Sequence, residues 1–363
     1  MMEDEDTRPQ PDPDLLQQIG QDILAEACRY LGRFTVLPHT ADTALVLFAA
    51  HCWAFRAWTE TPRIHLTSDT YGAGKTRVMR LTALMCPRPE EIAGATGPAA
   101  RRIVAERSPA PLCFDEIDVA FAGRGAKAED LRGILNAGYE AKGKLPRIEK
   151  GEVVDDPVFC PVICAGKGKL PKSLEDRAVS ICMVKRGRRQ QMERFVPKMH
   201  EAMGRKIGRL LGSWVTEIAG AAGDILWMDP PEKLADRQID ILTPLYSVAQ
   251  MAGGEWPGRF DEMVKVLVLG GAASDETSPA KALLSALGEV WPDGRDKLAT
   301  HELAGLLAGH ESGEFDWPEG QRAQELNARM RDLGIPPVPL WIGGKTMRGY
   351  QRQDVMGESL AGV

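Results

Sequence analysis

Apolar residues recur at helical spacing in some segments of the chain and alternate as in strands in others. Residues 15–31 show helical spacing, and residues 41–58 carry a denser apolar set that predicts a more buried helix. Arg63–Thr67 alternates as a strand, and a loop with two glycines separates it from a helix predicted over Thr76–Met85. The next apolar run, Ala110–Phe114, ends in two carboxylates, which places acidic side chains at the end of a second predicted strand.

Two more strand-like segments follow, Val158–Ala165 and Ala178–Val184, and both are rich in Val, Ile and Cys. A helix is predicted before them over Ala128–Tyr139. Strands that alternate with helices indicate an α/β fold, and nearly continuous apolar strands suit a sheet covered on both faces. We therefore expect a mostly parallel sheet between layers of helices.

The second half of the chain is mainly helical. Helices are expected within 190–222, 234–251 and 260–269, and a linker rich in Gly, Ala and Ser covers 270–278. Three helix-like pieces and a hairpin turned at Gly343-Gly344 then predict a winged-helix domain. The predicted organisation is a disordered acidic tail (1–14), an N-terminal helical region (15–58), an α/β core (59–189), a helical lid over that core (190–270) and a winged-helix-like domain (279–356).

The net charge of −6 over 363 residues argues at first against a nucleic-acid partner, whose footprint is usually basic. Six acidic residues and one arginine lie in residues 1–15, however, so the remainder of the chain is nearly neutral. A composition of 44% hydrophobic and 26% charged residues is typical of a globular protein and excludes collagen and disulfide miniproteins. The net charge therefore does not exclude DNA as a partner.

The seven cysteines form no CxxC pair, and most of them stand among aliphatic residues. This pattern favours a reducing, cytoplasmic compartment over a secreted protein. The six histidines lack metal-ligand spacing, and His65, inside a predicted strand, is interpreted as structural. Since no apolar run reaches about 18 residues, we expect no membrane span.

The candidate chemistry begins in Thr67–Thr76, where a GxGKT core stands between a predicted strand and a predicted helix. Glycines let backbone N–H groups surround phosphate oxygens, and the helix N-terminus favours anions. Lys75 is expected to contact the β- and γ-phosphates of ATP and Thr76 to ligate Mg²⁺. The predicted nucleotide-binding residues are Gly72, Ala73, Gly74, Lys75, Thr76 and Arg77. Asp69 stands where such loops usually have their first glycine.

The apolar strand that ends in Asp115-Glu116 supports this interpretation. It can lie beside the first strand and direct both carboxylates toward the γ-phosphate. Asp115 is expected to hold Mg²⁺, usually through water, and Glu116 to act as general base toward the attacking water. An adjacent Asp-Glu pair favours hydrolysis over transfer of the phosphoryl group to another substrate.

This order of motifs resembles Walker A and Walker B of the AAA+ ATPases. The resemblance implies a ring, typically a hexamer, in which Arg177 of Leu174-Glu175-Asp176-Arg177 acts as an arginine finger on the neighbouring subunit's nucleotide. The alternative is a surface ion pair with Glu175 or Asp176. The sensor-1 position falls near Gly166-Lys167. Arg237 resembles a sensor-2 arginine, and the alternative is an ordinary ion pair at a helix start.

A closer resemblance covers about residues 50–355. It rests on TPRIHLTS, GAGKTRV, FDEID, EDLRGILNAGY, PVICAGKGKLPKSLEDRAVSI, GGEWP and GGKTMRGYQRQD. These segments are similar to a poorly characterised family of P-loop ATPases from actinobacteria, their phages and mobile elements. Members of that family often occur beside primase-like or replication proteins.

Two segments are candidates for contact with DNA. Residues 142–153 resemble the pore hairpin of helicases of the minichromosome-maintenance and viral types, where cations grip phosphates. The candidate cations are Lys142, Lys144, Arg147 and Lys150, and the alternative is a solvated hairpin. In the predicted winged helix, Arg348 lies on the wing, and this module mediates either DNA or protein contacts.

Together these features predict a ring-forming, ATP-hydrolysing motor acting on DNA, a replication helicase or initiator of a phage or mobile element. Replication proteins are expected as partners. The alternatives are a nucleotide-switched helicase loader or regulator and a protein-remodelling ATPase in phage defence.

Overall fold

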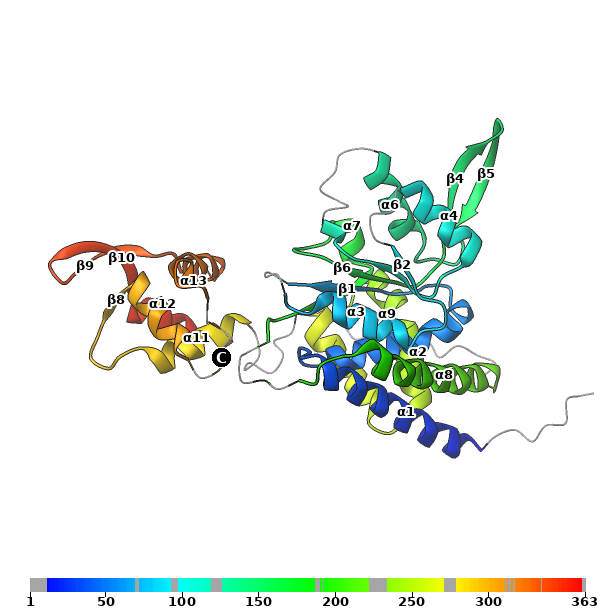
Figure 1. Ribbon diagram of the computed structural model, residues 1–363, viewed down its shortest axis with the longest axis horizontal. Coiled ribbons are helices and arrows are strands. Elements are labelled where there is room, and N and C mark those ends of the chain that lie inside the picture. Colours follow the sequence, from blue (N-terminus) through cyan, green and yellow to red (C-terminus); the bar gives the residue numbers. More distant parts are fainter. Residues whose placement is uncertain are drawn as a thin grey trace, which may run out of the picture. The chain divides into compact units, whose positions relative to one another are not determined.

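The chain divides into two compact units, each with a core of its own. The computed structural model describes residues 12–68, 72–92, 97–118, 126–186, 190, 192–221, 234–270, 279–310, 312, 315, 317–333 and 335–360 (Figure 1). Unit 1 comprises Met1–Val184 and Met192–Gly271, and unit 2 comprises Lys185–Gln191 and Ala272–Val363. Two predicted features, most of the acidic tail (1–11) and most of the linker (271–278), lie outside the described residues.

Unit 1 is built on a five-stranded sheet in the order β2-β3-β6-β1-β7, and all neighbouring strands pair in parallel. The strands are β1 (Arg63–Thr67), β2 (Glu90–Ile92), β3 (Leu112–Phe114), β6 (Val162–Ala165) and β7 (Ala178–Cys182). This confirms the predicted α/β class with a mostly parallel sheet. The expectation that the acidic strand lies beside the first strand was wrong, because β6 lies between β1 and β3.

Both faces of this sheet are apolar, as the near-continuous hydrophobic strands predicted. Side chains alternate along each strand, so Leu112 and Phe114 join one core cluster while Cys113 joins the other. The same alternation separates Val162 from Ile163. A layer of helices covers each of these cores.

The larger core lies under α1 (Pro13–Phe34), α2 (Ala41–Ala54), α3 (Lys75–Leu84), α8 (Pro197–Ala221), α9 (Asp236–Ala252) and α10 (Trp256–Met263). A 3₁₀ turn (Phe55–Ala57) follows α2, and a π turn (Val264–Val268) follows α10. The opposite face carries α4 (Gly97–Arg107), α6 (Ala126–Ala137) and α7 (Lys172–Glu175), as Figure 1 shows. The sheet is thus the middle layer of three.

Helix α2 is apolar all around and buried over almost its whole length. A helix of this kind needs packing partners on every side, and α1, α8 and α9 all contact it. The two helical segments predicted as separate regions, 15–58 and 190–270, therefore form one layer. Helix α1 also begins at Pro13, within the predicted tail, because proline suits the first turn and the Asp12 carboxylate accepts a 3.0 Å hydrogen bond from the Asp14 N–H.

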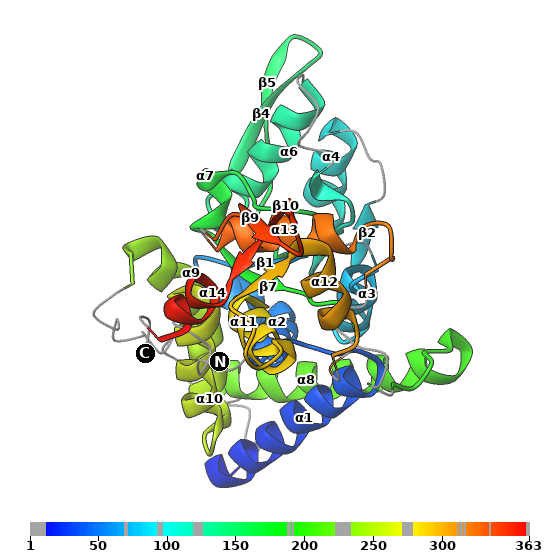
Figure 2. The ribbon, with the colours of Figure 1, turned by 90° about the vertical axis from the view of Figure 1, so that its left-hand side faces the viewer.

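A two-stranded hairpin, β4 (Lys144–Glu149) and β5 (Glu152–Pro157), projects from unit 1 (Figure 1, Figure 2). Lys150 and Gly151 turn it with φ of 52° and 88°, as two-residue hairpin loops require. The predicted hairpin is therefore confirmed as a structure.

Unit 2 combines helices with a three-stranded antiparallel sheet in the order β8-β10-β9. Its elements are α11 (Pro279–Val290), β8 (Lys297–Ala299), α12 (Thr300–Ala308), α13 (Arg322–Asp332), β9 (Val338–Ile342), β10 (Lys345–Gln351) and α14 (Arg352–Leu360). The predicted helices and hairpin are present, whereas β8 and α14 were not anticipated. Among all helices in the described part of the chain, none has the length and apolar character needed to cross a membrane.

Candidate functional site

The glycine loop joins the carboxyl end of β1 to the first turn of α3. Gly72 and Gly74 have φ of 78° and 88°, in the left-handed region that a residue with a Cβ rarely adopts. Gly74 is the N-cap of α3, so Lys75 and Thr76 begin the helix at its electropositive end. The departure at Asp69 lies outside the described residues.

A cavity of about 470 Å³ opens beside this loop and unites the predicted nucleotide site. It is lined by Gly72, Ala73, Gly74, Lys75, Thr76, Arg77, Arg80, Asp115, Glu116, Asp118, Gly166 and Lys167. Since β1, β3 and β6 are parallel, their carboxyl ends meet at one edge and bring these loops together. Every residue proposed for the phosphates, the metal ion and the general base lines one cavity, and the arginine-finger and sensor-2 candidates do not.

Two hydrogen bonds orient the phosphate-binding side chains. The Thr76 hydroxyl, in the first turn of α3, donates to Oδ2 of Asp115, just after β3, over 2.8 Å. The Lys75 ammonium donates to the hydroxyl of buried Ser68. Adjacent hydroxyl and carboxylate oxygens suit Mg²⁺, which prefers oxygen ligands and usually keeps water and substrate phosphates in its shell. No cluster of three or more His, Cys, Asp or Glu that could hold a metal occurs among the described residues.

Glu116 adopts φ of 56°, which is uncommon for a residue other than glycine. Its backbone N–H donates to Asp115 Oδ1 over 3.1 Å, and its side chain is exposed at the cavity. Backbone strain of this type costs about 1–3 kcal/mol and is retained mainly at functional sites. Thr40, Ser108 and Lys150 share this conformation away from the cavity, so the position of Glu116 in the cavity wall, and not its φ alone, makes it the candidate general base.

The sequence did not single out Asp118, which belongs to this site. Its Oδ1 accepts a 3.0 Å hydrogen bond from the Lys167 N–H at the end of β6. A Cβ at Gly166 would lie 2.8 Å from the same oxygen, so only glycine lets the two segments approach this closely. The third acid of FDEID was the available signal, but an acid in a turn resembles any solvated side chain.

A second cavity, of about 390 Å³, shares Asp118 and Lys167 with the first. His65 also lines it, and three basic side chains, Arg132, Lys167 and Lys169, lie in its wall. His65 is hydrogen-bonded to Ser180 across β1 and β7 at 3.3 Å, and burial together with nearby Lys75 lowers its pKa to about 4. It is therefore uncharged at neutral pH, as a structural histidine would be.

A third cavity, of about 560 Å³, lies along the outer side of α3 and shares Arg77 and Arg80 with the nucleotide cavity. The Arg77 guanidinium lies 5.5 Å from the centre of the Phe195 ring. The remaining wall mixes apolar residues, among them Leu84 and two prolines, with the charged side chains of Glu91, Glu201 and Arg205. A cavity that combines one aromatic ring with polar and charged side chains, next to a phosphate loop, can hold a nucleobase.

Arg177 lies at the opposite edge of the sheet, immediately before β7. Its backbone carbonyl accepts a 3.1 Å hydrogen bond from the N–H of Arg63, the first residue of β1. Its guanidinium donates to the Ser173 carbonyl and lies 4.5 Å from the centre of the Tyr139 ring. Arg177 is therefore remote from the nucleotide cavity of the same chain. Among the described residues it forms no ion pair with Glu175 or Asp176.

Arg237 is also remote from the nucleotide cavity. It occupies the second position of α9, and it is exposed. Burial, together with the nearby charges of Asp240 (one turn further along α9) and Glu140, raises the pKa of the Glu60 carboxyl, so the start of α9 lies close to Glu60. Because Glu60 precedes β1, the start of α9 lies at the amino edge, and the structure does not bring Arg237 to the phosphates.

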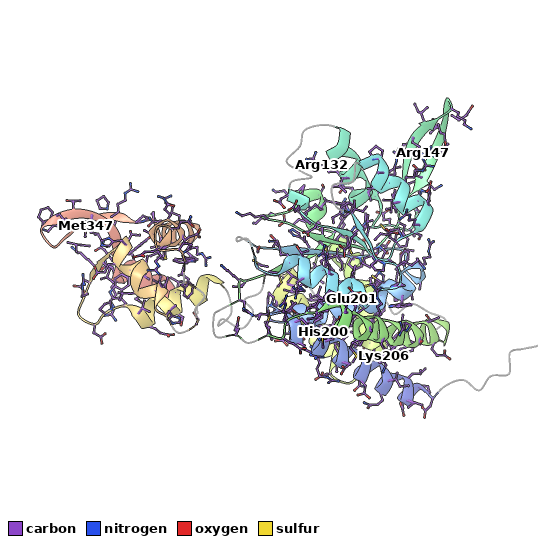
Figure 3. All side chains as sticks on the ribbon, in the orientation of Figure 1. Arg132, Arg147, His200, Glu201, Lys206 and Met347 are labelled. Atoms are coloured by element: carbon purple, nitrogen blue, oxygen red, sulfur yellow. The ribbon has the colours of Figure 1, made fainter. Side chains whose placement is uncertain are left out.

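One of the four predicted DNA-binding cations near the β4–β5 hairpin, Arg147, forms ion pairs within the protein. Arg147, labelled in Figure 3, is 2.9 Å from Asp156 and 2.6 Å from Glu149. Arg101 of α4 approaches the same Asp156 at 3.2 Å, which fixes the hairpin base to unit 1. The contacts of Arg147 are thus internal, while Lys142, Lys144 and Lys150 are exposed, as is Arg348 in unit 2.

One family model matches the second half of the chain, and one relative matches 46% of the chain. A profile of the family described as "Protein of unknown function (DUF3631)" matches residues 182–358, from the end of β7 through unit 2. An uncharacterized 28.9 kDa protein in the xis 5′ region of Saccharopolyspora erythraea is 28% identical over 170 residues. The match covers 46% of this chain and 64% of that protein, so the chain spans less than two thirds of its relative. Function must therefore be inferred from the site.

Proposed function

We propose that this chain is a Mg²⁺-dependent ATPase of the P-loop type. The observation that carries the proposal is the single cavity that unites a left-handed glycine loop, Lys75, Thr76 and the Asp115-Glu116 pair. The left-handed glycines and the start of α3 supply N–H donors to phosphate oxygens. The cavity beside Arg77 and Phe195 supports a nucleoside triphosphate over a free phosphate.

In this mechanism Lys75 leaves Ser68 to contact the β- and γ-phosphates, and Thr76 and Asp115 provide oxygen ligands. Bound Mg²⁺ would neutralise charge on the phosphate oxygens. Glu116 accepts a proton from the water that attacks the γ-phosphorus. Asp118 fixes the Lys167 segment at the γ-phosphate side of the cavity.

Binding tests the first half of this proposal. Lys75→Ala should weaken binding of a fluorescent ATP analogue at least about 100-fold, because it removes a charge-assisted contact to the phosphates. Lys206→Ala, at an exposed position of α8 (Figure 3), should leave binding unchanged. Equal binding by the wild type and Lys75→Ala would exclude the assigned site.

We further propose that the core is of the AAA+ type and assembles into a ring, with a hexamer as the expected form. The strand order supports this class of core: β6 lies between β1, which precedes the glycine loop, and β3, which precedes Asp115. The distance of Arg177 from its own cavity supports action on a neighbouring subunit, because an arginine at the amino edge has no route to the phosphates in the same chain. Seven free thiols support a reducing, cytoplasmic setting.

For unit 2 we propose a winged-helix fold that binds DNA, with α13 as the recognition helix and β9–β10 as the wing. The order of helices, the antiparallel sheet and the exposed cations on the hairpin support this. ATP hydrolysis would then drive a replication helicase or initiator. The test is the ATPase rate with and without DNA, and the expected result is stimulation.

One observation favours the alternative in which the ATPase acts on a protein, as a loader or remodelling enzyme. Ile148 and Val153 face each other across the β4–β5 hairpin and are 79% and 71% exposed. Exposed apolar pairs are more typical of protein contacts than of phosphate contacts. Two results together would favour this alternative. The ATPase rate would not change with DNA, and Ile148→Ser would lower that rate only when a protein substrate is present.

A further inference from the structure

One tryptophan of unit 2 is displayed to solvent on the β9–β10 hairpin. Trp341 is 68% exposed, in contrast to Trp291 and Trp317, which are buried in the core of the same unit. The antiparallel register sets Trp341 opposite Thr346. A large aromatic ring kept in water on a projecting hairpin marks an interaction surface.

The strand register shows which residues share the face of Trp341. Side chains alternate along a strand, so Thr346, Arg348 and Tyr350 of β10 lie on the same side. The Tyr350 hydroxyl donates to Asn327 Oδ1 of α13 over 2.7 Å. The face that carries Trp341 and Arg348 is therefore the one that meets α13. By the same alternation Met347, labelled in Figure 3, has its side chain on the other face.

The charges around this face identify its ligand class. Arg331 of α13 and Lys345 and Arg348 of the hairpin are exposed. None of the three has an ion-pair partner among the residues described for this unit, in contrast to Arg147 of the other hairpin. Free cations beside an exposed aromatic ring suit a polyanion that also carries flat apolar groups, which is a nucleic acid.

We propose that Trp341, Thr346 and Arg348 form a site for an unpaired base of DNA at a junction between duplex and single strand. The bases of a duplex are stacked on one another, so the ring of Trp341 gains a partner only where a base is unpaired. Arg348 and Lys345 contact the adjacent phosphates, and the duplex arm lies along α13. This inference rests on the proposed binding of DNA by unit 2 and adds the form of DNA that is preferred.

Fluorescence anisotropy with the full-length protein tests the site. The probes are a labelled blunt duplex and the same duplex with a single-stranded oligo(dT) tail. Trp341→Ala should weaken binding of the tailed duplex by about 5- to 150-fold, the range for loss of one stacked base, and change blunt-duplex binding less than about twofold. Trp341→Phe should retain most of the affinity, because a phenyl ring still stacks.

Two controls separate stacking from charge and from misfolding. Arg348→Ala should weaken binding of both probes alike and reduce the salt dependence, as loss of one phosphate contact predicts. Leu306→Ala, at a partly exposed position of α12, should bind both probes as the wild type does. Thermal unfolding of each variant verifies that the unit is folded.

Three results would overturn the inference. The first is equal affinity of the wild type for the two probes, and the second is equal loss on both probes in Trp341→Ala. The third is absence of any DNA binding by the wild type, which would also remove DNA as the proposed partner of unit 2. The ATP-binding test with Lys75→Ala is unaffected by all three, so failure of the ATPase proposal is seen separately.

Discussion

The two edges of the parallel sheet present their polar residues in opposite ways. At the carboxyl edge, Lys75, Glu116 and Lys167 line an open cavity. At the amino edge, Arg63 is buried and donates to the carbonyls of Leu135 and Cys160 over 3.3 and 2.9 Å.

His51 is buried at the same amino edge, and Arg177 is partly exposed there. Arg177 lies over Tyr139, and buried His51 is hydrogen-bonded to Thr61 at 2.9 Å. The carboxyl edge thus has an open cavity, whereas the polar groups of the amino edge bond to the chain itself and hold the strands together.

The largest expected effect lies at the amino edge, in Arg177. Arg177→Ala should lower ATP turnover of the assembled protein by about 10³-fold, the usual contribution of an arginine finger, with little change in ATP binding. Lys75→Ala subunits, which keep Arg177, should restore part of this turnover when mixed in. If the Lys75→Ala subunits restored no turnover at any mixing ratio, Arg177 would not act on the nucleotide of a neighbouring subunit. The two edges would then be functionally independent.

The next largest effect concerns stability at the amino edge. Arg63→Ala should lower the free energy of unfolding by about 3 kcal/mol, because it leaves buried carbonyls without donors and opens a cavity. Chemical denaturation measures this, with Arg102→Ala at an exposed position of α4 as the control. A change below about 0.5 kcal/mol would mean that Arg63 is not the structural group described here.

At the carboxyl edge, Asp118 should affect rate and not folding. Asp118→Ala should lower ATP turnover by about 10- to 100-fold, because the Lys167 segment loses its anchor and shifts at the γ-phosphate. Asp118→Asn keeps an acceptor oxygen and should retain most of the turnover. Asp176→Ala, an exposed acid of the amino edge, serves as the matched control. Wild-type turnover in Asp118→Ala would remove this residue from the site.

The smallest effect is the dependence of stability on pH at the amino edge. Burial lowers the pKa of His51 to about 3, whereas an unfolded histidine titrates near about 6.5. Between these values the unfolded chain binds a proton that the folded chain excludes, so stability is full above pH 6.5 and falls on acidification. The slope from this one group is at most about 1.4 kcal/mol per pH unit.

His51→Gln should flatten the pH dependence of stability between pH 6.5 and 5, measured by urea denaturation. His65 contributes in the same direction and stays in place in this variant. An unchanged slope in His51→Gln would show that the histidine is not held neutral by the fold.

Most secondary structure of both units followed from the sequence. The apolar spacing of residues 63–67 predicted β1 with its observed bounds, and the predicted strand Ala178–Val184 contains β7. The short strand β2 escaped detection because two of its three residues are glutamates. Helix α4, which starts with Gly97-Pro98, lacked a clear apolar stripe.

The arrangement of these elements in space was harder to predict. The glycine loop and the Asp-Glu pair were recognisable as local motifs, but no local pattern reports that β6 lies between their strands. Likewise, Arg147 looked free because its partner Asp156 is nine residues away across the hairpin. Glycine is needed at position 166 because a Cβ there would meet the Asp118 carboxylate, and these two residues come together only in the folded chain.

The central claim is tested most directly by ATP turnover in Glu116→Gln beside the wild type, with ATP-analogue binding measured on the same samples. The account predicts Mg²⁺-dependent hydrolysis by the wild type, and in the variant a loss of turnover of about 10²–10⁴-fold with binding retained. Hydrolysis by Glu116→Gln at the wild-type rate, or no hydrolysis by the wild type alone or with DNA, would contradict it.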